Sequence, residues 1–179
     1  MKVFLSGGSK SGKSALAEQT AIALSGTGKR YYIATMIPHD AEDAARIRRH
    51  VERRAGGDFI TLEQGRGVLA CLERAEPAAT FLLDSVTALL SNEMFLPDGA
   101  VDFDAPERLV RELCSLADRV ENIVFVSDFI FADAGLYDSY TEAFRRGLAR
   151  CDRALASVCD TVAEVSAGFP VLYKGVLPV

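Results

Sequence analysis

The chain has 179 residues, a formal net charge of −5, 49% apolar residues and 25% charged residues. This balance is typical of a folded globular protein and excludes a disordered chain, and the length predicts one domain spanning residues 1–179. The negative net charge excludes a strong electrostatic attraction for DNA or RNA, whose phosphates bind clustered Lys and Arg. We therefore expect no nucleic-acid partner.

The four cysteines predict neither a metal site nor a disulfide framework. Cys71, Cys114, Cys151 and Cys159 show no Cys-x-x-Cys spacing, and the chain has two histidines. A structural zinc site is therefore not expected. The first residues do not resemble a signal peptide, and no run approaches the roughly 20 apolar residues of a membrane span. We expect a cytoplasmic protein with reduced thiols and no membrane span.

Short apolar runs alternate with longer helical patterns, which predicts an α/β protein with a mainly parallel sheet flanked by helices. The first strand covers residues 2–5, and a helix follows over 13–24. A strand over 30–34, a helix over 40–54 and a short strand over 59–62 come next. A helix over 68–75 precedes a buried strand over 80–83, and residues 97–106 form a loop. A helix (107–120), a strand (123–126), a helix (140–158) and two strands (161–165 and 171–173) complete the expected order.

The strongest motif is Gly-x-x-x-x-Gly-Lys-Ser, which begins at Gly7, directly after the first expected strand. Glycines let the backbone curl so that several N–H groups point at phosphate oxygens, and the positive end of the following helix adds to the attraction. Lys13 supplies a mobile charge for the β- and γ-phosphates, and the Ser14 hydroxyl can ligate Mg²⁺. The alternative is a Gly-Ser turn that happens to precede a helix. The strand before it and the helix after it favour a nucleotide-binding P-loop.

A P-loop site usually has an acidic partner at the end of a neighbouring strand, which holds the metal directly or through water. Two aspartates fit this position, because Asp84 follows the run Phe-Leu-Leu and Asp128 follows Phe-Val-Ser. Either could be no more than a polar strand end. We favour Asp84 and keep Asp128 as the alternative.

The helix expected over residues 40–54 carries a basic face. Arg46, Arg49, His50 and Arg53 are spaced at i, i+3, i+4 and i+7, so they share one side of the helix. One interpretation is a solvated surface, with Glu42 and Arg46 as an i,i+4 pair and an idle histidine. The other is a nucleophilic or acid–base His50, since nearby guanidinium groups would lower its pKa and keep the imidazole neutral.

Further motifs extend the pattern over nearly the whole chain. After the P-loop they are Tyr32-Ile33-Ala34-Thr35, Arg46-Ile47-x-x-His50-x-x-Arg53-Arg54, Thr61-x-Glu63, Leu82-Leu83-Asp84-Ser85-Val86-Thr87 and Ala167-Gly168-Phe169-Pro170. In this order and spacing the chain resembles the bifunctional adenosylcobinamide kinase / adenosylcobinamide-phosphate guanylyltransferase family of cobalamin biosynthesis.

The resemblance implies a RecA-like P-loop fold, usually assembled as a homotrimer, and a two-step enzyme that acts on a corrinoid. In the kinase step, GTP or ATP phosphorylates the aminopropanol hydroxyl of adenosylcobinamide. In the transferase step, His50 attacks the α-phosphate of GTP, releases pyrophosphate and carries GMP to the corrinoid phosphate. His50 and Lys13 would then be catalytic, and Ser14 and Asp84 would hold Mg²⁺. The resemblance places around the nucleotide Gly7, Gly8, Ser9, Lys10, Ser11, Gly12, Lys13, Ser14, Ala34, Thr35, Met36, Val51, Glu52, Arg53, Arg54, Glu63 and Asp84.

The segment after the strand over 123–126 departs from the family pattern. Where the family reads Ser/Thr-Asn-Glu-Val-Gly, this chain reads Ser127-Asp128-Phe129-Ile130-Phe131. The large apolar residues predict either core or subunit interface, or a reshaped acceptor pocket, since loops after sheet strands form the ligand crevice in α/β folds. Two other functions stay open on sequence alone: a P-loop kinase for another small alcohol, and a non-catalytic nucleotide-sensing protein.

Overall fold

The computed structural model describes residues 1–38, 58–132 and 135–179. Its centre is a seven-stranded sheet in the order β3-β2-β4-β5-β1-β6-β7. All neighbouring strands are parallel except β6 and β7, which form an antiparallel hairpin. The strands are β1 (Lys2–Gly7), β2 (Arg30–Ala34), β3 (Phe59–Glu63), β4 (Thr80–Asp84), β5 (Asn122–Asp128), β6 (Thr161–Ser166) and β7 (Phe169–Lys174).

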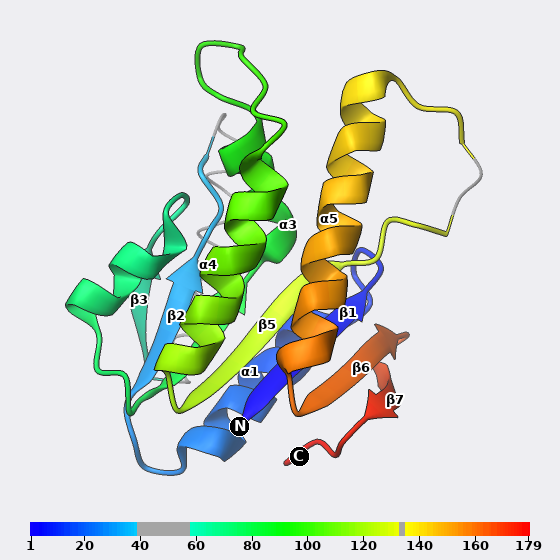
Figure 1. The fold of residues 1–179 in the computed structure, drawn as a ribbon. Helices are drawn as coiled ribbons and strands as arrows, with labels where there is room; N and C mark the ends of the chain where they lie inside the picture. The colour runs from blue at the N-terminus through cyan, green and yellow to red at the C-terminus, as the bar shows by residue number, and fades with distance from the viewer. Residues whose placement is uncertain (39–57, 133–134) are drawn as a thin grey trace.

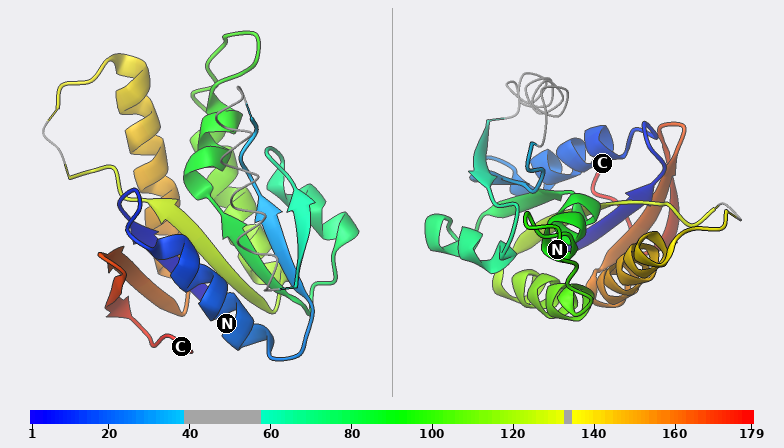
Figure 2. Two further views of the ribbon diagram at one scale, coloured as in Figure 1. Left: turned by 180° about the vertical axis from the view of Figure 1, so that it is seen from behind. Right: turned by 90° about the horizontal axis from the view of Figure 1, so that it is seen from above.

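Helices cover both faces of the sheet (Figure 1). One face carries α1 (Lys13–Ser25), as the view from above makes clear (Figure 2). The other face carries the 3₁₀ helix η1 (Val68–Arg74), α3 (Val86–Met94), α4 (Ala105–Arg119) and α5 (Ser139–Val158). Of the helices in the described ranges, none has the length and apolar character needed to cross a membrane.

The apolar runs of the sequence form buried strands because helices shield both faces of the sheet. On the side of α3, α4 and α5, Phe81 and Phe125 are fully buried among apolar residues of these helices. On the other side, Leu5 packs with Ala17 and Ala21 of α1, whose small side chains let the helix lie close to the sheet. Complete burial of one large apolar side chain contributes about 1.5–3 kcal/mol, so the core fixes β1 and the start of α1 relative to each other.

The structure confirms the α/β class, the mainly parallel sheet and all seven expected strands. The helix expected over 68–75 is the 3₁₀ helix η1. The expected loop over 97–106 ends earlier than predicted, because α4 begins at Ala105 with Pro106 in its first turn, where a proline needs no hydrogen-bond donor. The helix expected over 40–54 lies outside the described residues.

Helix α3 was not predicted. It begins directly after β4, where the Ser85 side chain accepts a hydrogen bond from the backbone N–H of Ala88. The sequence pattern failed here because several sides of α3 are covered. Leu89, Asn92 and Met94 are all buried, so no polar stripe alternates with an apolar one.

The parallel strands end at a common edge of the sheet. The carboxyl ends of β1 and β5 lie side by side, with Gly7 in register with Asp128, and β4 ends next to β5 at Asp84. In open α/β sheets, ligands bind in the crevice outside the carboxyl ends of the strands. The motifs found in the sequence therefore meet where this fold class places its ligands.

Candidate nucleotide-binding site

The loop from Gly8 to Gly12 turns the chain from β1 into α1. Lys10 (φ 59°) and Gly12 (φ 96°) adopt left-handed backbone conformations, and the N–H of Ser11 donates to the carbonyl of Gly8 at 3.2 Å. Among the described residues, no side chain caps the start of α1. The first N–H groups of the helix therefore stay open to an anion, and the helix dipole favours negative charge at that position.

Lys13 is held inside this loop. Its side chain is only 10% exposed, and its Nζ lies 2.6 Å from Oδ1 of Asp128 and donates to the carbonyl of Gly8 at 3.1 Å. A poorly hydrated ammonium group needs a counter-charge and hydrogen bonds, because its desolvation is costly. Asp128, the less favoured metal partner in the sequence, is thus the ion-pair partner of the P-loop lysine.

Three expected site residues form one row at the carboxyl edge. Ala34 at the end of β2 is in register with Glu63 of β3 on one side and with Asp84 of β4 on the other. Oδ2 of Asp84 accepts a hydrogen bond from the hydroxyl of Tyr32 at 3.1 Å, and Glu63 is exposed. The register therefore places one carboxylate on each side of β2 at the carboxyl edge of the sheet.

Thr35 is a buried anchor behind this row. Its hydroxyl donates to the carbonyl of Ser85 at 2.8 Å and accepts from the N–H of Ser85 at 2.7 Å. The buried amide of Asn92 donates to the carbonyls of Thr35 and Gly65 at 2.7 and 2.9 Å. These bonds tie the segments after β2, β3 and β4 together, so the row is held by α3, the helix that the sequence did not predict.

The hairpin between β6 and β7 supports the P-loop from the other side. The N–H of Gly168 donates to the carbonyl of Ser11 at 2.8 Å, and a Cβ built on Gly12 would lie 3.1 Å from Cα of Gly168. The sequence motif that contains Gly168 had no assigned role. The contact joins residues more than 150 positions apart, so only the fold could reveal it.

Comparison with known proteins gives this arrangement a family. Residues 3–172 match the family model described as cobinamide kinase / cobinamide phosphate guanyltransferase. The chain belongs to this family. It is also 31% identical over 180 residues to a Pseudomonas aeruginosa protein named bifunctional adenosylcobalamin biosynthesis protein CobP, and the match covers 98% of both chains.

Solved structures share the fold with this member of the cobinamide kinase / guanyltransferase family. A protein of Pyrococcus horikoshii OT3 superposes with a TM-score of 0.52 at 11% identity, over 98% of this chain and 86% of the other. The flagellar accessory protein FlaH of Methanocaldococcus jannaschii gives a TM-score of 0.46 at 11% identity, over 97% and 78%. The mainly parallel sheet, with the P-loop between β1 and α1, agrees with the α/β P-loop fold that the resemblance implied.

The nucleotide residues that the family resemblance implied fall into two groups. Those in residues 7–14, together with Ala34, Thr35, Met36, Glu63 and Asp84, lie in or beside the P-loop or at the ends of β2, β3 and β4. The second group lies outside the described residues: His50, Val51, Glu52, Arg53 and Arg54.

The family reaction uses a nucleoside triphosphate, which normally carries Mg²⁺. No cluster of three or more His, Cys, Asp or Glu side chains able to hold a metal exists among the residues described. Magnesium at triphosphate sites commonly takes its ligands from phosphates, waters and one or two protein oxygens. The Ser14 hydroxyl in the first turn of α1 and the Asp84 carboxylate are oxygen donors of the required kind.

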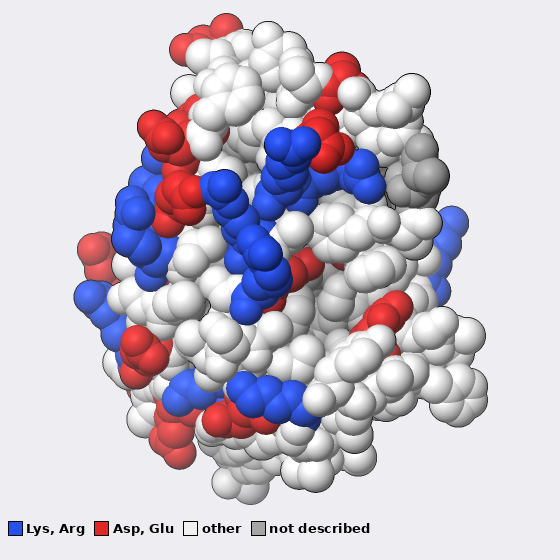
Figure 3. Space-filling view, turned by 45° about the vertical axis from the view of Figure 1, so that its right-hand side comes forward, with Lys and Arg blue, Asp and Glu red and all other residues white. Residues whose placement is uncertain are grey.

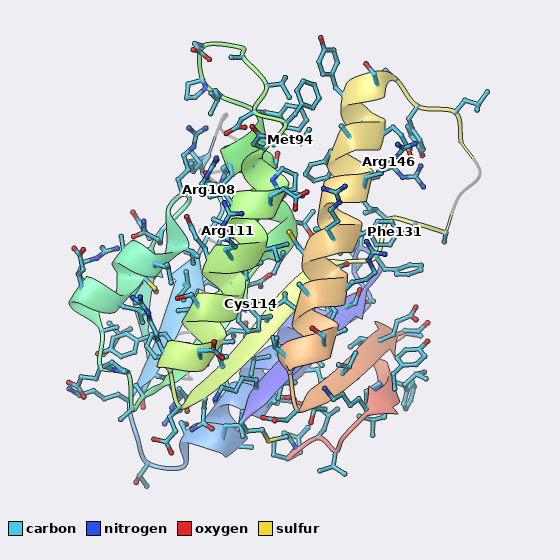
Figure 4. All side chains as sticks on the ribbon, viewed as in Figure 1. Met94, Arg108, Arg111, Cys114, Phe131 and Arg146 are labelled. Atoms are coloured by element: carbon cyan, nitrogen blue, oxygen red, sulfur yellow. The ribbon has the colours of Figure 1, made fainter. Side chains whose placement is uncertain are left out.

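The segment that departs from the family pattern is partly core. Ile130 and Phe131 pack against the main core, and Phe131 lies beside α5 (Figure 4). Phe129 is 39% exposed and contacts the edge of the Phe131 ring, with 5.5 Å between ring centroids. The core interpretation therefore holds for Ile130 and Phe131, while Phe129 stays at the surface beside the P-loop, with its N–H donating to the carbonyl of Gly7.

Proposed function

We propose that this family member transfers GMP from GTP to a cobinamide phosphate through a guanylylated His50, and also phosphorylates the cobinamide alcohol. The observation that carries the proposal is that two groups of residues lie at the same edge of the sheet. They are the P-loop with its enclosed Lys13, and the row of Ala34, Glu63 and Asp84.

The P-loop would hold the terminal phosphates. Its open N–H groups and the positive end of α1 bind phosphate oxygens, and Lys13 exchanges the carboxylate of Asp128 for the phosphate charge. The carbonyl of Gly8 keeps the lysine directed into the loop during this exchange. Mg²⁺, held by Ser14 and Asp84, would neutralise charge that develops on the pyrophosphate leaving group.

The row at the ends of β2, β3 and β4 would hold the guanosine. Glu63 is an exposed carboxylate at the outer end of this row, and a carboxylate can accept two parallel hydrogen bonds from the ring N–H and amino group of guanine. Adenine presents an acceptor at the matching ring position, so it would meet repulsion instead of a bond. Thr35 supports specificity because its hydrogen bonds to Ser85 fix the strand end against which the nucleoside lies.

The transfer itself would pass through His50, which lies outside the described residues. A neutral imidazole nitrogen attacks the α-phosphorus of GTP, a phosphorus–nitrogen bond forms, and the bond to the bridging oxygen breaks with release of pyrophosphate. The corrinoid phosphate oxygen then attacks the same phosphorus and frees the imidazole.

By family resemblance we expect the protein to act as a homotrimer, which sedimentation analysis can test.

Labelled GTP tests the intermediate. Label from the α-phosphate should stay with the denatured protein, while label from the γ-phosphate should not. The label should be lost in acid and kept in base, as expected for phosphorus on imidazole nitrogen, and His50→Ala and His50→Asn should abolish it. Label that persists in these variants would show that His50 is not the nucleophile. GTP binding without any label would favour nucleotide sensing.

A further inference from the structure

A row of polar side chains crosses the sheet directly behind the P-loop. Ser6 of β1 is in register with Ser127 of β5 on one side and with Glu164 of β6 on the other. Two residues earlier in the same strands, Phe4 and Phe125 belong to the core on the α5 side. Side chains two positions apart share a sheet face, so the polar row also faces α5.

Helix α5 adds a carboxylate to this row. Asp152 follows the buried Leu148 by four residues, so it is on the sheet side of the helix. Burial raises the pKa of Asp152 to about 7; the nearby Ser127 hydroxyl opposes this rise, and the negative charge of Asp128 adds to it. Asp152 is therefore close both to Ser127 and to the ion-pair partner of Lys13.

The protein satisfies these groups incompletely: the Ser127 hydroxyl interacts with the Asp152 carboxylate, and neither has a further partner recorded in the described ranges. Oγ of Ser6, Oγ of Ser127 and Oδ1 of Asp152 are buried, and none makes a hydrogen bond of ordinary geometry to another residue in the described ranges. Ser127 is completely buried. A buried polar atom without a well-aligned partner destabilises the folded state, and folded proteins leave few of them. The partnerless Oγ of Ser6 beside the Ser127–Asp152 pair indicates a place where a hydrogen-bonding ligand can bind.

The polar row ends at Glu164 of β6, which pairs with β7 at the edge of the sheet. Figure 3 shows a hollow on this side of the molecule, with basic side chains along one border and acidic side chains within it and at its opposite border. On β7, Val171 is in register with Glu164, and Tyr173 donates a hydrogen bond to Glu164 at 3.0 Å. Phe169, Val171 and Tyr173 alternate along one face of the strand and are 77%, 52% and 69% exposed. A polar floor thus adjoins an apolar, solvent-exposed border.

We propose that Ser6, Ser127, Asp152 and Glu164 bind the alcohol arm of the acceptor, with Asp152 accepting the hydrogen bond of its hydroxyl. Ser6 precedes the first P-loop residue, and Ser127 precedes Asp128, so an arm bound here lies next to the phosphate site. Two carboxylates favour a neutral donor such as an alcohol or amide and disfavour a phosphate. The apolar border on β7 suits the larger body of a corrinoid, whose amide side chains can also use the polar floor.

This inference rests on the proposed function, because it locates the acceptor of the same enzyme. Calorimetric titration with cobinamide in the absence of nucleotide tests it. Wild-type protein should bind cobinamide, and Asp152→Ala should bind it at least tenfold more weakly. GTP affinity and α-label incorporation should be unchanged in this variant. Asp118→Ala, which removes an exposed carboxylate of α4, is the matched control and should bind cobinamide like wild type.

Two results would overturn the inference. One is equal affinity of wild type and Asp152→Ala for cobinamide. The other is a wild-type protein that takes the GMP label but does not bind cobinamide. A wild-type protein that binds cobinamide but takes no GMP label would instead count against the proposed transfer through His50. If Asp152→Ala does not fold, Ser127→Ala keeps the core shape and should weaken binding at least threefold, so unchanged affinity in that variant is equally decisive.

Discussion

Replacement of Gly12 by alanine tests whether the β6–β7 hairpin holds the P-loop. Gly12 has a φ of 96°, and a left-handed conformation costs a residue with a Cβ about 1–2 kcal/mol. The new Cβ would also lie 3.1 Å from Cα of Gly168, so backbone must move, which adds roughly 1–2 kcal/mol. We expect a total loss of about 2–4 kcal/mol, which lowers the melting temperature by roughly 4–16 °C for a chain of this size.

Thermal unfolding without nucleotide measures this loss, and two further glycines separate its causes. Gly8→Ala adds a Cβ that meets nothing within 4 Å, at a residue without a positive φ, and should leave the melting temperature nearly unchanged. Gly168→Ala places a Cβ in open space at a φ of 86°, so it should show the conformational cost alone. If Gly12→Ala lowers the melting temperature no more than Gly168→Ala does, the close contact between hairpin and loop does not exist in solution.

Three more predictions follow from contacts described above. Lys13→Ala removes the charge that serves the β- and γ-phosphates and should weaken GTP binding at least about tenfold, roughly 1.4 kcal/mol, by calorimetry; unchanged affinity in a folded variant would reject the P-loop assignment. Asp152 has a pKa raised by burial from 3.8 to about 7, so its ionisation disfavours the folded state, and its contribution to wild-type stability should fall between about pH 4 and pH 7 by up to about 4 kcal/mol. Asp152→Asn should remove that part of the pH dependence in urea titrations, and parallel curves for the two proteins would show that the carboxyl is not buried. Asn92→Ala should cost about 1–3 kcal/mol in the same titrations, because the carbonyls of Thr35 and Gly65 lose their donor, and a loss below 0.5 kcal/mol would contradict this anchoring role.

Local chemistry was predictable from the sequence. The P-loop was recognised because its glycines, lysine and serine act through backbone conformations and charges fixed within eight residues. The central strands β1, β4 and β5 were recognised because burial on both faces demands continuous apolar runs. The row of Ala34, Glu63 and Asp84 was implied by family resemblance, and the sheet register places these three residues side by side.

Features that depend on tertiary contacts were not predictable. The pairing of Asp128 with Lys13 depends on which strand lies beside β1, and the strand order is set by packing of the whole sheet. The role of Gly168 depends on a hairpin that approaches the loop from the far end of the chain. The polar row behind the P-loop requires three strands in register and one helix above them. Ser6 and Ser127, taken alone, resemble ordinary strand residues.

The position of β1 in the sheet has a consequence for the order in which the protein folds. The P-loop strand precedes both of its neighbours in the chain, since these are β5 and β6, made from residues 122–128 and 161–166. Contacts between such distant segments form late, because a long loop must close before they contribute stability. A chain that stops before β6 therefore keeps the complete P-loop motif but lacks one neighbour of the P-loop strand and the bond from Gly168 to Ser11.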